Sequence, residues 1–341
     1  MILINDFISP TIFVFFFSIL CIYFFKKKNL LLDKTAHSSH KKLRILSLSS
    51  PPLCGGIILY VSLLIFFKDE FILKIFSLGI LSVGILSDTN KISSPKIRII
   101  LQFFLVSLFV FFSEISLEDL RVDHLNNMLS NKFISITFTI FCILILINGT
   151  NFLDGLNTLV IGYYILVITI IILATYKFDL ILNHNIFFLL LFLCIIYFFN
   201  LLEKFYLGDS GSYLLAFVVG FFILDFFNKN NDISPYFISL LLWYPAFENL
   251  FSILRRASFS KKFYKPDQSH LHQIIFNFFV KKKFFYKKQT NSLTANLINF
   301  FNALVFFIFY KYLYETNVMV IIIILNIIFY LSIYFLIRKK A

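Results

Sequence analysis

About eleven long apolar runs, separated by short polar segments, take up most of this chain. Its mean hydropathy is +0.86, and 59% of its 341 residues are hydrophobic whereas 14% are charged. A soluble domain of this size has no core that could hold so much apolar surface, so the solvent of this chain is expected to be a lipid bilayer. The composition therefore predicts an all-α, polytopic integral membrane protein.

A membrane-spanning helix needs roughly 20 apolar residues, and fewer where neighbouring helices surround it. By this criterion the predicted spans are residues 8–25, 53–67, 71–86, 97–113, 133–147, 156–176, 186–200, 212–227, 236–254, 293–314 and 318–337. We expect them to form a single transmembrane domain over residues 1–341, without a soluble domain.

The basic loops predict the orientation of these spans. Lysine and arginine are concentrated in residues 26–44, in residues 255–288 and at the C-terminus, whereas the loop 114–132 carries four acidic residues. Short loops rich in lysine and arginine face the cytoplasm. We therefore expect an outside N-terminus, a cytoplasmic C-terminus and cytoplasmic loops at residues 26–52, 87–96, 148–157, 201–211 and 255–292.

The net charge of +13 lies mainly in these juxtamembrane loops. There it fits the positive-inside rule and the anionic headgroups of membrane lipid. The charge therefore predicts a membrane surface as partner and no nucleic acid.

Four polar segments interrupt the apolar runs: residues 87–90, 148–155, 207–212 and 266–272. The topology puts all four at the cytoplasmic surface. Ionisable groups beside hydrocarbon are costly to keep, so a convergent set of them indicates a functional site. The sequence thus predicts a membrane-embedded enzyme.

Three aspartates and one asparagine give these segments their chemistry. Asp88, Asp154, Asp209 and Asn151 offer hard oxygen ligands, which suit a hydrated Mg²⁺ completed by substrate phosphates. Glycines flank the acids at expected helix starts, where backbone N–H groups attract anions. We infer a metal-assisted phosphate reaction at the inner membrane surface.

The last polar segment follows a basic stretch. Arg255 and Arg256 precede Asp267, His270 and His272, and such a set can clamp a diphosphate by charge and hydrogen bonding. The lysines of this loop are explained by topology alone. For the first basic loop, which contains His40, a solvated loop and a functional role are equally compatible with the residues.

The order, spacing and sidedness of these segments resemble those of the polyprenyl-phosphate N-acetylhexosamine-1-phosphate transferases. The resemblance runs from about residue 33 to residue 272. The positions that carry it are Asp33, His40, Pro52, Gly55, Gly56, Gly84, Asp88, Lys96, Arg98, Gln102, Asn148, Asn151, Asp154, Gly155, Gly208, Asp209, Gly211, Arg255, Arg256, Pro266, Asp267, His270 and His272.

Three positions depart from the family pattern. Ser87 stands where the family has the first of two aspartates, and Asn157 stands where it has another acid. Gln273 replaces the third histidine of the last segment. This form is more similar to the branch that starts O-antigen and enterobacterial common antigen than to the peptidoglycan branch.

The resemblance implies transfer of an N-acetylhexosamine-1-phosphate, with GlcNAc-1-phosphate as first choice, from a UDP-sugar to undecaprenyl phosphate. The products would be undecaprenyl diphosphate-sugar and UMP. This would be the first membrane step of a cell-envelope glycan such as O-antigen, at the cytoplasmic face of a bacterial inner membrane. The implied cofactor is Mg²⁺, with Mn²⁺ as its substitute.

The resemblance also assigns roles. The metal ligands would be Asp209 and Asp88, and the catalytic residues Asp88, Asp154, His270 and His272. The substrate-binding residues would be His40, Asn151, Gly155, Asn157, Asn200, Arg255, Arg256 and Asp267.

Two other classes of function stay open at this point. A transporter of an anionic solute would also have about eleven helices and internal charges, but transporter sites lie near the midplane. A catalytically inactive scaffold or regulator of the same fold is suggested by Ser87 and Asn157. Apolar faces could also pair two copies of the chain as a homodimer.

Overall fold

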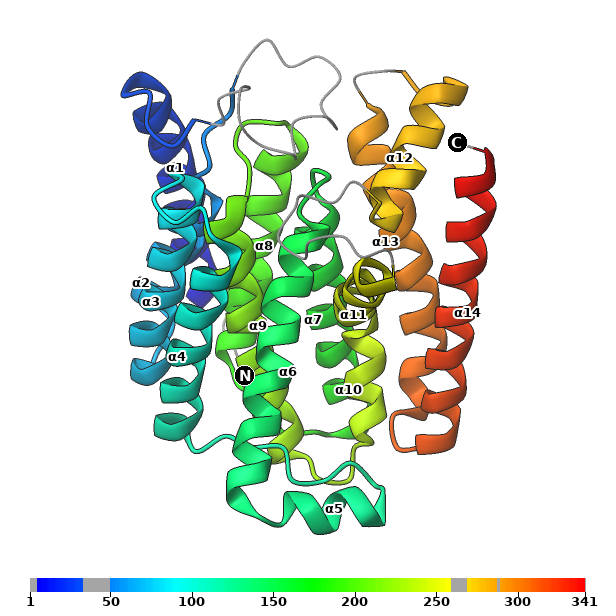
Figure 1. Ribbon diagram of the computed structural model, residues 1–341. Helices are drawn as coiled ribbons and strands as arrows, with labels where there is room; N and C mark the ends of the chain where they lie inside the picture. The colour runs from blue at the N-terminus through cyan, green and yellow to red at the C-terminus, as the bar shows by residue number, and fades with distance from the viewer. Residues whose placement is uncertain (1–4, 33–49, 259–268, 287–288, 341) are drawn as a thin grey trace.

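The computed structural model describes residues 5–32, 50–258, 269–286 and 289–340 (Figure 1). The helices are α1 (Asn5–Lys27), α2 (Gly55–Phe66), α3 (Phe71–Asp88), α4 (Pro95–Ser113), α5 (Asp123–Leu129), α6 (Lys132–Leu153), α7 (Leu159–Phe178), α8 (Asn185–Leu201), α9 (Gly208–Lys229), α10 (Pro235–Leu241), α11 (Trp243–Ser258), α12 (Leu271–Lys282), α13 (Thr290–Phe309), the 3₁₀ turn η2 (Tyr310–Tyr312) and α14 (Thr316–Lys340). An isolated bridge between Leu32 and Pro52 is the single β interaction among the described residues. The predicted all-α class is confirmed for this part of the chain.

Each predicted span falls on one helix, except that residues 236–254 fall on two, and the helices differ in length. Within the described ranges, eight are long and apolar enough to cross a membrane, and the bent pair α10 and α11 would be a ninth. The short apolar helices α2 and α8 account for the other two predicted spans. The polytopic membrane class therefore holds, while the count of eleven spans stays a prediction.

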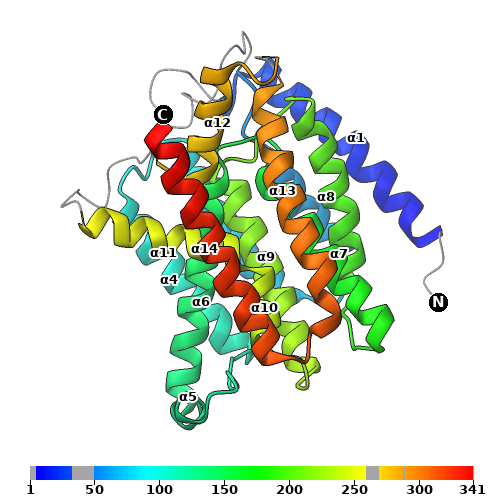
Figure 2. The same cartoon turned by 90° about the vertical axis from the view of Figure 1, so that its right-hand side faces the viewer.

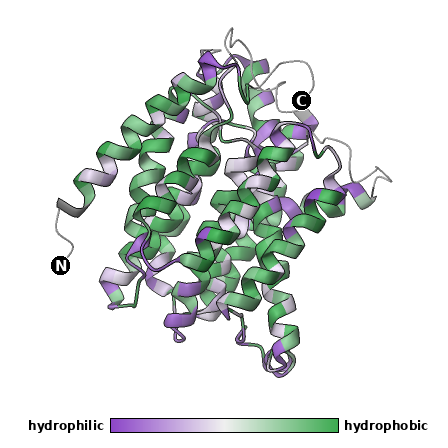
Figure 3. Cartoon of the chain, turned by 90° about the vertical axis from the view of Figure 1, so that its left-hand side faces the viewer, coloured by the Kyte–Doolittle hydropathy of each residue, from purple (hydrophilic) through white to green (hydrophobic). Residues whose placement is uncertain are grey.

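Helix α9 lies at the centre of the bundle. Of its most apolar window 94% is buried, against 22% for α1 and 17% for α14. It packs against α2, α3, α6 and α10. The outer helices expose mostly hydrophobic surface, whereas polar residues gather at the two ends of the bundle (Figure 3). This distribution is expected where lipid surrounds the protein.

The predicted span 236–254 is broken into α10 and α11, which meet at an angle of 75°. Pro245 has no N–H, so it cannot bond to the carbonyl of Leu241 one turn earlier. The hydroxyl of Tyr163 on α7 donates to that carbonyl instead (2.8 Å). The bend thus has a local cause and a tertiary contact that satisfies it.

The two ends of the bundle differ in charge. The acidic loop with α5 lies at one end, and the last turn of α14 lies at the other (Figures 1 and 2). The end that holds the last turn of α14 also holds the carboxyl end of α3 and the amino end of α9, and we call it the site end. Which end faces the cytoplasm stays a prediction.

Candidate active site

The carboxyl end of α3 meets the amino end of α9 through Asp88. The backbone N–H of Asp209 donates to Asp88 Oδ1 (2.8 Å), and that of Ser210 donates to Asp88 Oδ2 (3.0 Å). The first N–H groups of a helix have no partner within it and lie at the positive end of its dipole, so a carboxylate is well placed there. Asp88 thereby fixes where α9 begins and where Asp209 lies.

Two glycines permit this close approach. Gly208 has φ +73°, in the left-handed region, and a Cβ there would lie 2.9 Å from Asp88 Oδ2. On α3, a Cβ at Gly84 would lie 2.2 Å from Ser210 Cα. These helices therefore pack backbone against backbone at the site end.

Asp209 is held by Arg98 and Ser87. Arg98 Nη1 on α4 lies 2.8 Å from Asp209 Oδ2 and donates to Ser87 Oγ (2.7 Å). The Ser87 hydroxyl in turn donates to Asp209 Oδ2. The side chains of Arg98 and Asp209 are 22% and 17% exposed, so a ligand could still reach this ion pair. Arg98 is absent from the residues predicted for the site, although the basic start of its helix was the signal that could have found it.

The polar contacts continue from α9 to α6. The Ser212 hydroxyl donates to Asn151 Oδ1 (3.0 Å), and Asn151 Nδ2 donates to the Tyr213 hydroxyl (3.4 Å). Arg98 Nη1 donates to the same tyrosine oxygen (3.4 Å). Asn151 is therefore joined to the Asp209 cluster through α9.

The turn after α6 holds the next predicted residues. Asp154 ends α6, and Asp154 and Gly155 are both partly exposed. The N–H of Asn157 donates to Asn291 Oδ1 (2.7 Å).

Asn200 is 3% exposed; its Oδ1 accepts from the N–H of Thr158 (2.6 Å). Its Nδ2 donates to the carbonyl of Phe205 (3.0 Å). Asn200 thus holds the backbone of two loops beside the site.

The last polar segment joins the same cluster. The His270 ring lies 5.1 Å from the Phe152 ring, and the His272 ring stacks on His270 at 5.7 Å. Both histidines are buried. Arg256 lies over Phe152 at 5.7 Å from the ring centroid. The second and fourth polar segments therefore meet around Phe152.

Arg255 is held by contacts within the protein, whereas an arginine that binds a substrate diphosphate would be expected to face solvent. Its Nη1 donates to the carbonyl of Ser269 and to the Tyr334 hydroxyl (3.0 Å). Its guanidinium lies 5.4 Å from the ring centroid of Phe251 and 5.7 Å from that of Tyr334, and the residue is 9% exposed. Arg255 thus connects α11 to α14 and to the start of the histidine segment.

These contacts confirm that the four polar segments converge at one end of the bundle. The first meets the third through Asp88, the third meets the second through Ser212, and the second meets the fourth through Phe152. His40 and Asp267 lie outside the described residues. The roles assigned to single residues stay predictions.

The oxygens of this cluster limit how a metal could be held. In the described part of the chain, no three His, Cys, Asp or Glu side chains come together as a metal cage. Asp209 is a partly exposed carboxylate, and each oxygen of Asp88 accepts one backbone N–H. Mg²⁺ is often bound by one or two carboxylates and completed by water and substrate phosphates. The donor set fits Mg²⁺ in that form, with Asp209 and Asp88 as the residues that would hold it.

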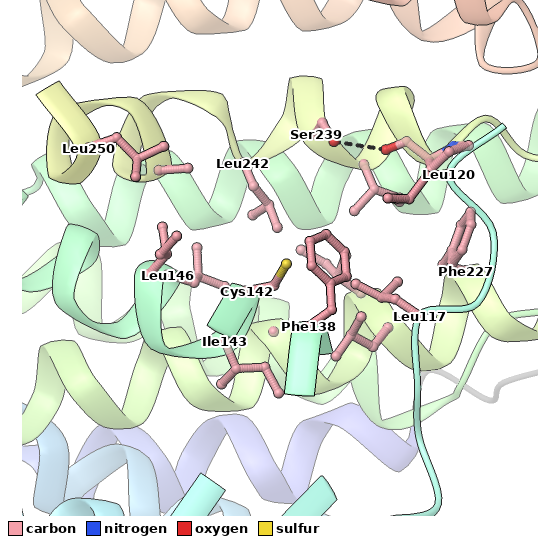
Figure 4. A pocket seen from close by; sticks show the side chains of 17 residues that line it. Leu117, Leu120, Phe138, Cys142, Ile143, Leu146, Phe227, Ser239, Leu242 and Leu250 are labelled. Carbon is pink, nitrogen blue, oxygen red and sulfur yellow. Dashed lines mark hydrogen bonds between the residues drawn. The ribbon is translucent and has the colours of Figure 1, made fainter. Parts of the chain in front are cut away.

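An apolar cavity of about 230 Å³ lies between α6, α9, α10 and α11 (Figure 4). Phe138 and Cys142 of α6 line it, as do Leu242 at the bend and Leu250 on α11. Ala246 and Leu250 belong to the helix that also carries Arg255. The cavity therefore borders α11, the helix that leads to the histidine segment.

Comparison with known proteins agrees with this arrangement. Residues 71–227 match the model of glycosyl transferase family 4. A Bacillus subtilis (strain 168) protein described as "Probable undecaprenyl-phosphate N-acetylglucosaminyl 1-phosphate transferase" is 24% identical over 207 residues. The alignment covers 58% of this chain and 56% of that relative, so the chain spans little more than half of the relative's length.

The matched segment contains Asn151 and the three acids of the first three polar segments, Asp88, Asp154 and Asp209. This segment is similar to glycosyl transferase family 4, and the two matches confirm the resemblance of the chain to the polyprenyl-phosphate N-acetylhexosamine-1-phosphate transferases.

Proposed function

We propose that this protein transfers an N-acetylhexosamine-1-phosphate from a UDP-sugar to undecaprenyl phosphate. An oxygen of the lipid phosphate bonds to the sugar-proximal phosphorus of the donor, and the bond from that phosphorus to the bridging oxygen breaks. UMP leaves with that oxygen, and the lipid keeps the sugar on a diphosphate. The observation that carries this proposal is the Asp88–Asp209–Arg98 cluster, joined to Asn151 and the histidines at one end of an apolar bundle.

The protein's contribution is positioning and charge. Arg98 keeps Asp209 in a fixed orientation and offsets part of its charge. Asn151, Asp154 and Asn157 would lie on the nucleotide side, and His270, His272 and Arg256 on the diphosphate side. Bound Mg²⁺, or Mn²⁺ in its place, would neutralise the charge that develops on the phosphate oxygens. Gly155 would let the donor approach the backbone, as glycine does at other phosphate sites.

The acceptor would lie partly in the bilayer. Its phosphate has to reach Asp209 at the surface while its tail stays in hydrocarbon. The cavity between α6 and the bent α10–α11 pair is apolar and suits a prenyl segment. Lateral entry between helices would let the lipid bind without leaving the membrane.

The proposal includes a donor, a location and a pathway. The relative's description names N-acetylglucosaminyl 1-phosphate transfer, so UDP-GlcNAc is our first choice of donor. Asp267 and His40 would complete the donor site as they do in the family pattern. We propose the cytoplasmic face of a bacterial inner membrane as the location, and the first lipid-linked step of O-antigen as the pathway.

The test is UMP release by purified protein in detergent. Undecaprenyl phosphate, Mg²⁺ and each of several UDP-N-acetylhexosamines are supplied together and then omitted singly. We expect release that requires the lipid, the metal and one donor. Asp209→Asn should lower the rate by about a hundredfold, in the range seen when one charge-stabilising group is lost from an active site.

Asp225→Asn is the matched control, because Asp225 lies on the same helix at its other end, paired with Lys229 (2.8 Å). Its rate should stay near that of the wild type. Folded protein that releases no UMP with any donor would favour an inactive scaffold or a transporter. Equal rates for Asp209→Asn and Asp225→Asn would contradict the role given to Asp209.

A further inference from the structure

A buried carboxylate on α11 lies behind the histidine segment. Glu248 is fully buried, and both of its oxygens have partners. The Tyr330 hydroxyl of α14 donates to Oε2 (2.7 Å), and His270 Nδ1 lies 2.9 Å from Oε1. Tyr330 is 1% exposed. A carboxylate inside a membrane protein is costly unless it is paired, and such groups commonly mark functional sites.

The contact determines which nitrogen of His270 carries the proton. An ionised carboxylate only accepts hydrogen bonds, so the Nδ1 atom that faces Glu248 has to be the donor. The Ser252 hydroxyl of α11 lies 3.3 Å from the same nitrogen and accepts a hydrogen bond from Arg255 Nη2 (3.4 Å). With Nδ1–H engaged in this way, Nε2 is the nitrogen that can accept from or donate to a substrate.

The same carboxylate also fixes the ring in space. His270 stands at the start of α12, where its backbone N–H donates to Gln273 Oε1 (3.3 Å). Its ring stacks on that of His272 and makes a tilted contact with Phe152 of the second polar segment. Glu248 therefore joins α11 to the point where the second and fourth polar segments meet.

We propose that Glu248, oriented by Tyr330, is a positioning residue that keeps the proton of His270 on Nδ1 and its ring in place for phosphosugar transfer. The statement about catalysis rests on the proposed function, whereas the position of the proton does not. The role of Tyr330 gives α14, which lies outside the matched family segment, a part in the active site. Neither Glu248 nor Tyr330 touches the reacting atoms in this account.

Tyr330 and Tyr244 form a matched pair for the test. Both are buried in one aromatic cluster, with ring centroids 6.4 Å apart. The Tyr330 hydroxyl bonds to Glu248, while the Tyr244 hydroxyl has no hydrogen-bond partner among the described residues. Replacing either by phenylalanine deletes one buried hydroxyl, but only Tyr330→Phe removes a bond to Glu248.

The experiment combines kinetics with ¹⁵N NMR of histidine-labelled protein, in which His270→Asn identifies the His270 signals. In the wild type we expect the shifts of an Nδ1-protonated ring. In Glu248→Gln those shifts should move toward a mixture of tautomers, and kcat should fall by about 10- to 100-fold with KM changed less than threefold. Tyr330→Phe should show a smaller loss of kcat in the same direction, and Tyr244→Phe none.

Wild-type kcat and unchanged ¹⁵N shifts in Glu248→Gln would overturn the proposal, as would equal losses in Tyr330→Phe and Tyr244→Phe. Should Glu248→Gln not fold, the two tyrosine variants decide the question on their own. If the wild type releases no UMP, the proposed function fails, and the ¹⁵N shifts still decide whether Glu248 sets the proton of His270.

Discussion

At the scale of single residues, the site is built around one partly exposed carboxylate, that of Asp209, with the cation of Arg98 beside it. Ser87 stands where the family pattern has an aspartate, and its hydroxyl donates to Asp209. It keeps the contact between α3 and α9 but adds no negative charge. Arg98, 2.8 Å from Asp209, then compensates the negative charge of Asp209. Such a site should bind a metal weakly until substrate phosphates complete the coordination.

Restoring the acid at position 87 should change how this site binds a metal. Ser87→Asp adds a second carboxylate beside Asp209, so it should bind Mn²⁺ about tenfold more tightly, because affinity for such ions follows the number of charged ligands. Repulsion between the acids should also lower the melting temperature, and added Mg²⁺ should recover it. Electron paramagnetic resonance of Mn²⁺ and thermal melting in detergent measure both effects.

Thr89→Asp is the control for this variant. Thr89 is exposed and lies two positions further along the chain, where an added charge does not face Asp209. It should bind Mn²⁺ as the wild type does. Equal Mn²⁺ affinity in Ser87→Asp and the wild type would contradict the idea that the missing acid weakens this site.

At the scale of elements, the position of Asp209 depends on how closely α3 approaches α9. A methyl group on Gly84 would meet the backbone of Ser210, which cannot move aside as a side-chain tip can. Gly84→Ala should therefore lower both the melting temperature and the rate of UMP release, by about tenfold or more for the rate. Fluorescence of the single tryptophan, Trp243, follows the melting.

The same helix provides the control. A methyl group on Gly79 would meet Cδ2 of Leu105 at 2.8 Å, and that side chain can rotate away. Both substitutions improve helix propensity by about 1 kcal/mol, so this effect cancels in the comparison. Gly79→Ala should stay near the wild type, and equal effects of the two substitutions would contradict the backbone contact.

The elements also show what the sequence could and could not predict. Long apolar runs locate the helices because hydrocarbon allows few other structures. Helices α5 and α12 were not predicted, because both are much shorter than the roughly 20 apolar residues by which the spans were located. The bend between α10 and α11 was missed as well, although Pro245 marked it. The hydroxyl of Tyr163, which supports the bend, comes from a helix distant in sequence.

At the scale of the whole molecule, the motifs located the site but not its internal contacts. The order of the polar segments predicts that they meet, and they do. Arg98 is one of the positions that carry the resemblance, but the motif does not say that it faces Asp209, and nothing in a single sequence says that Glu248 faces His270. Asn200 was predicted to bind substrate, while its observed contacts are with loop backbone.

The end of the bundle opposite the site predicts a pH dependence of stability. Burial raises the pKa of the Glu70 carboxyl above its ordinary value, although Asn183 and Asn185 donate hydrogen bonds to it. The pKa of Glu70 is therefore higher in the folded than in the unfolded protein. The contribution of protonated Glu70 to the free energy of unfolding is complete below the unfolded-state pKa, and it is lost as the pH rises through the folded-state pKa.

Glu70→Gln removes this titration. Its melting temperature should match the wild type near pH 4 and exceed it near pH 8, when both are followed in the same detergent. Parallel curves at all pH values, or a lower melting temperature for Glu70→Gln at pH 8, would contradict this assignment.

The central claim is that one site moves a phosphosugar onto a lipid phosphate. The most direct measurement follows phosphorus in UDP-GlcNAc labelled with ³²P at either position of its diphosphate, with wild-type protein, Mg²⁺ and undecaprenyl phosphate. We predict that label at the sugar-proximal phosphorus moves into the organic extract, while label at the uridine-proximal phosphorus stays in water as UMP. Both labels remaining in water, or both entering the lipid, would contradict the account.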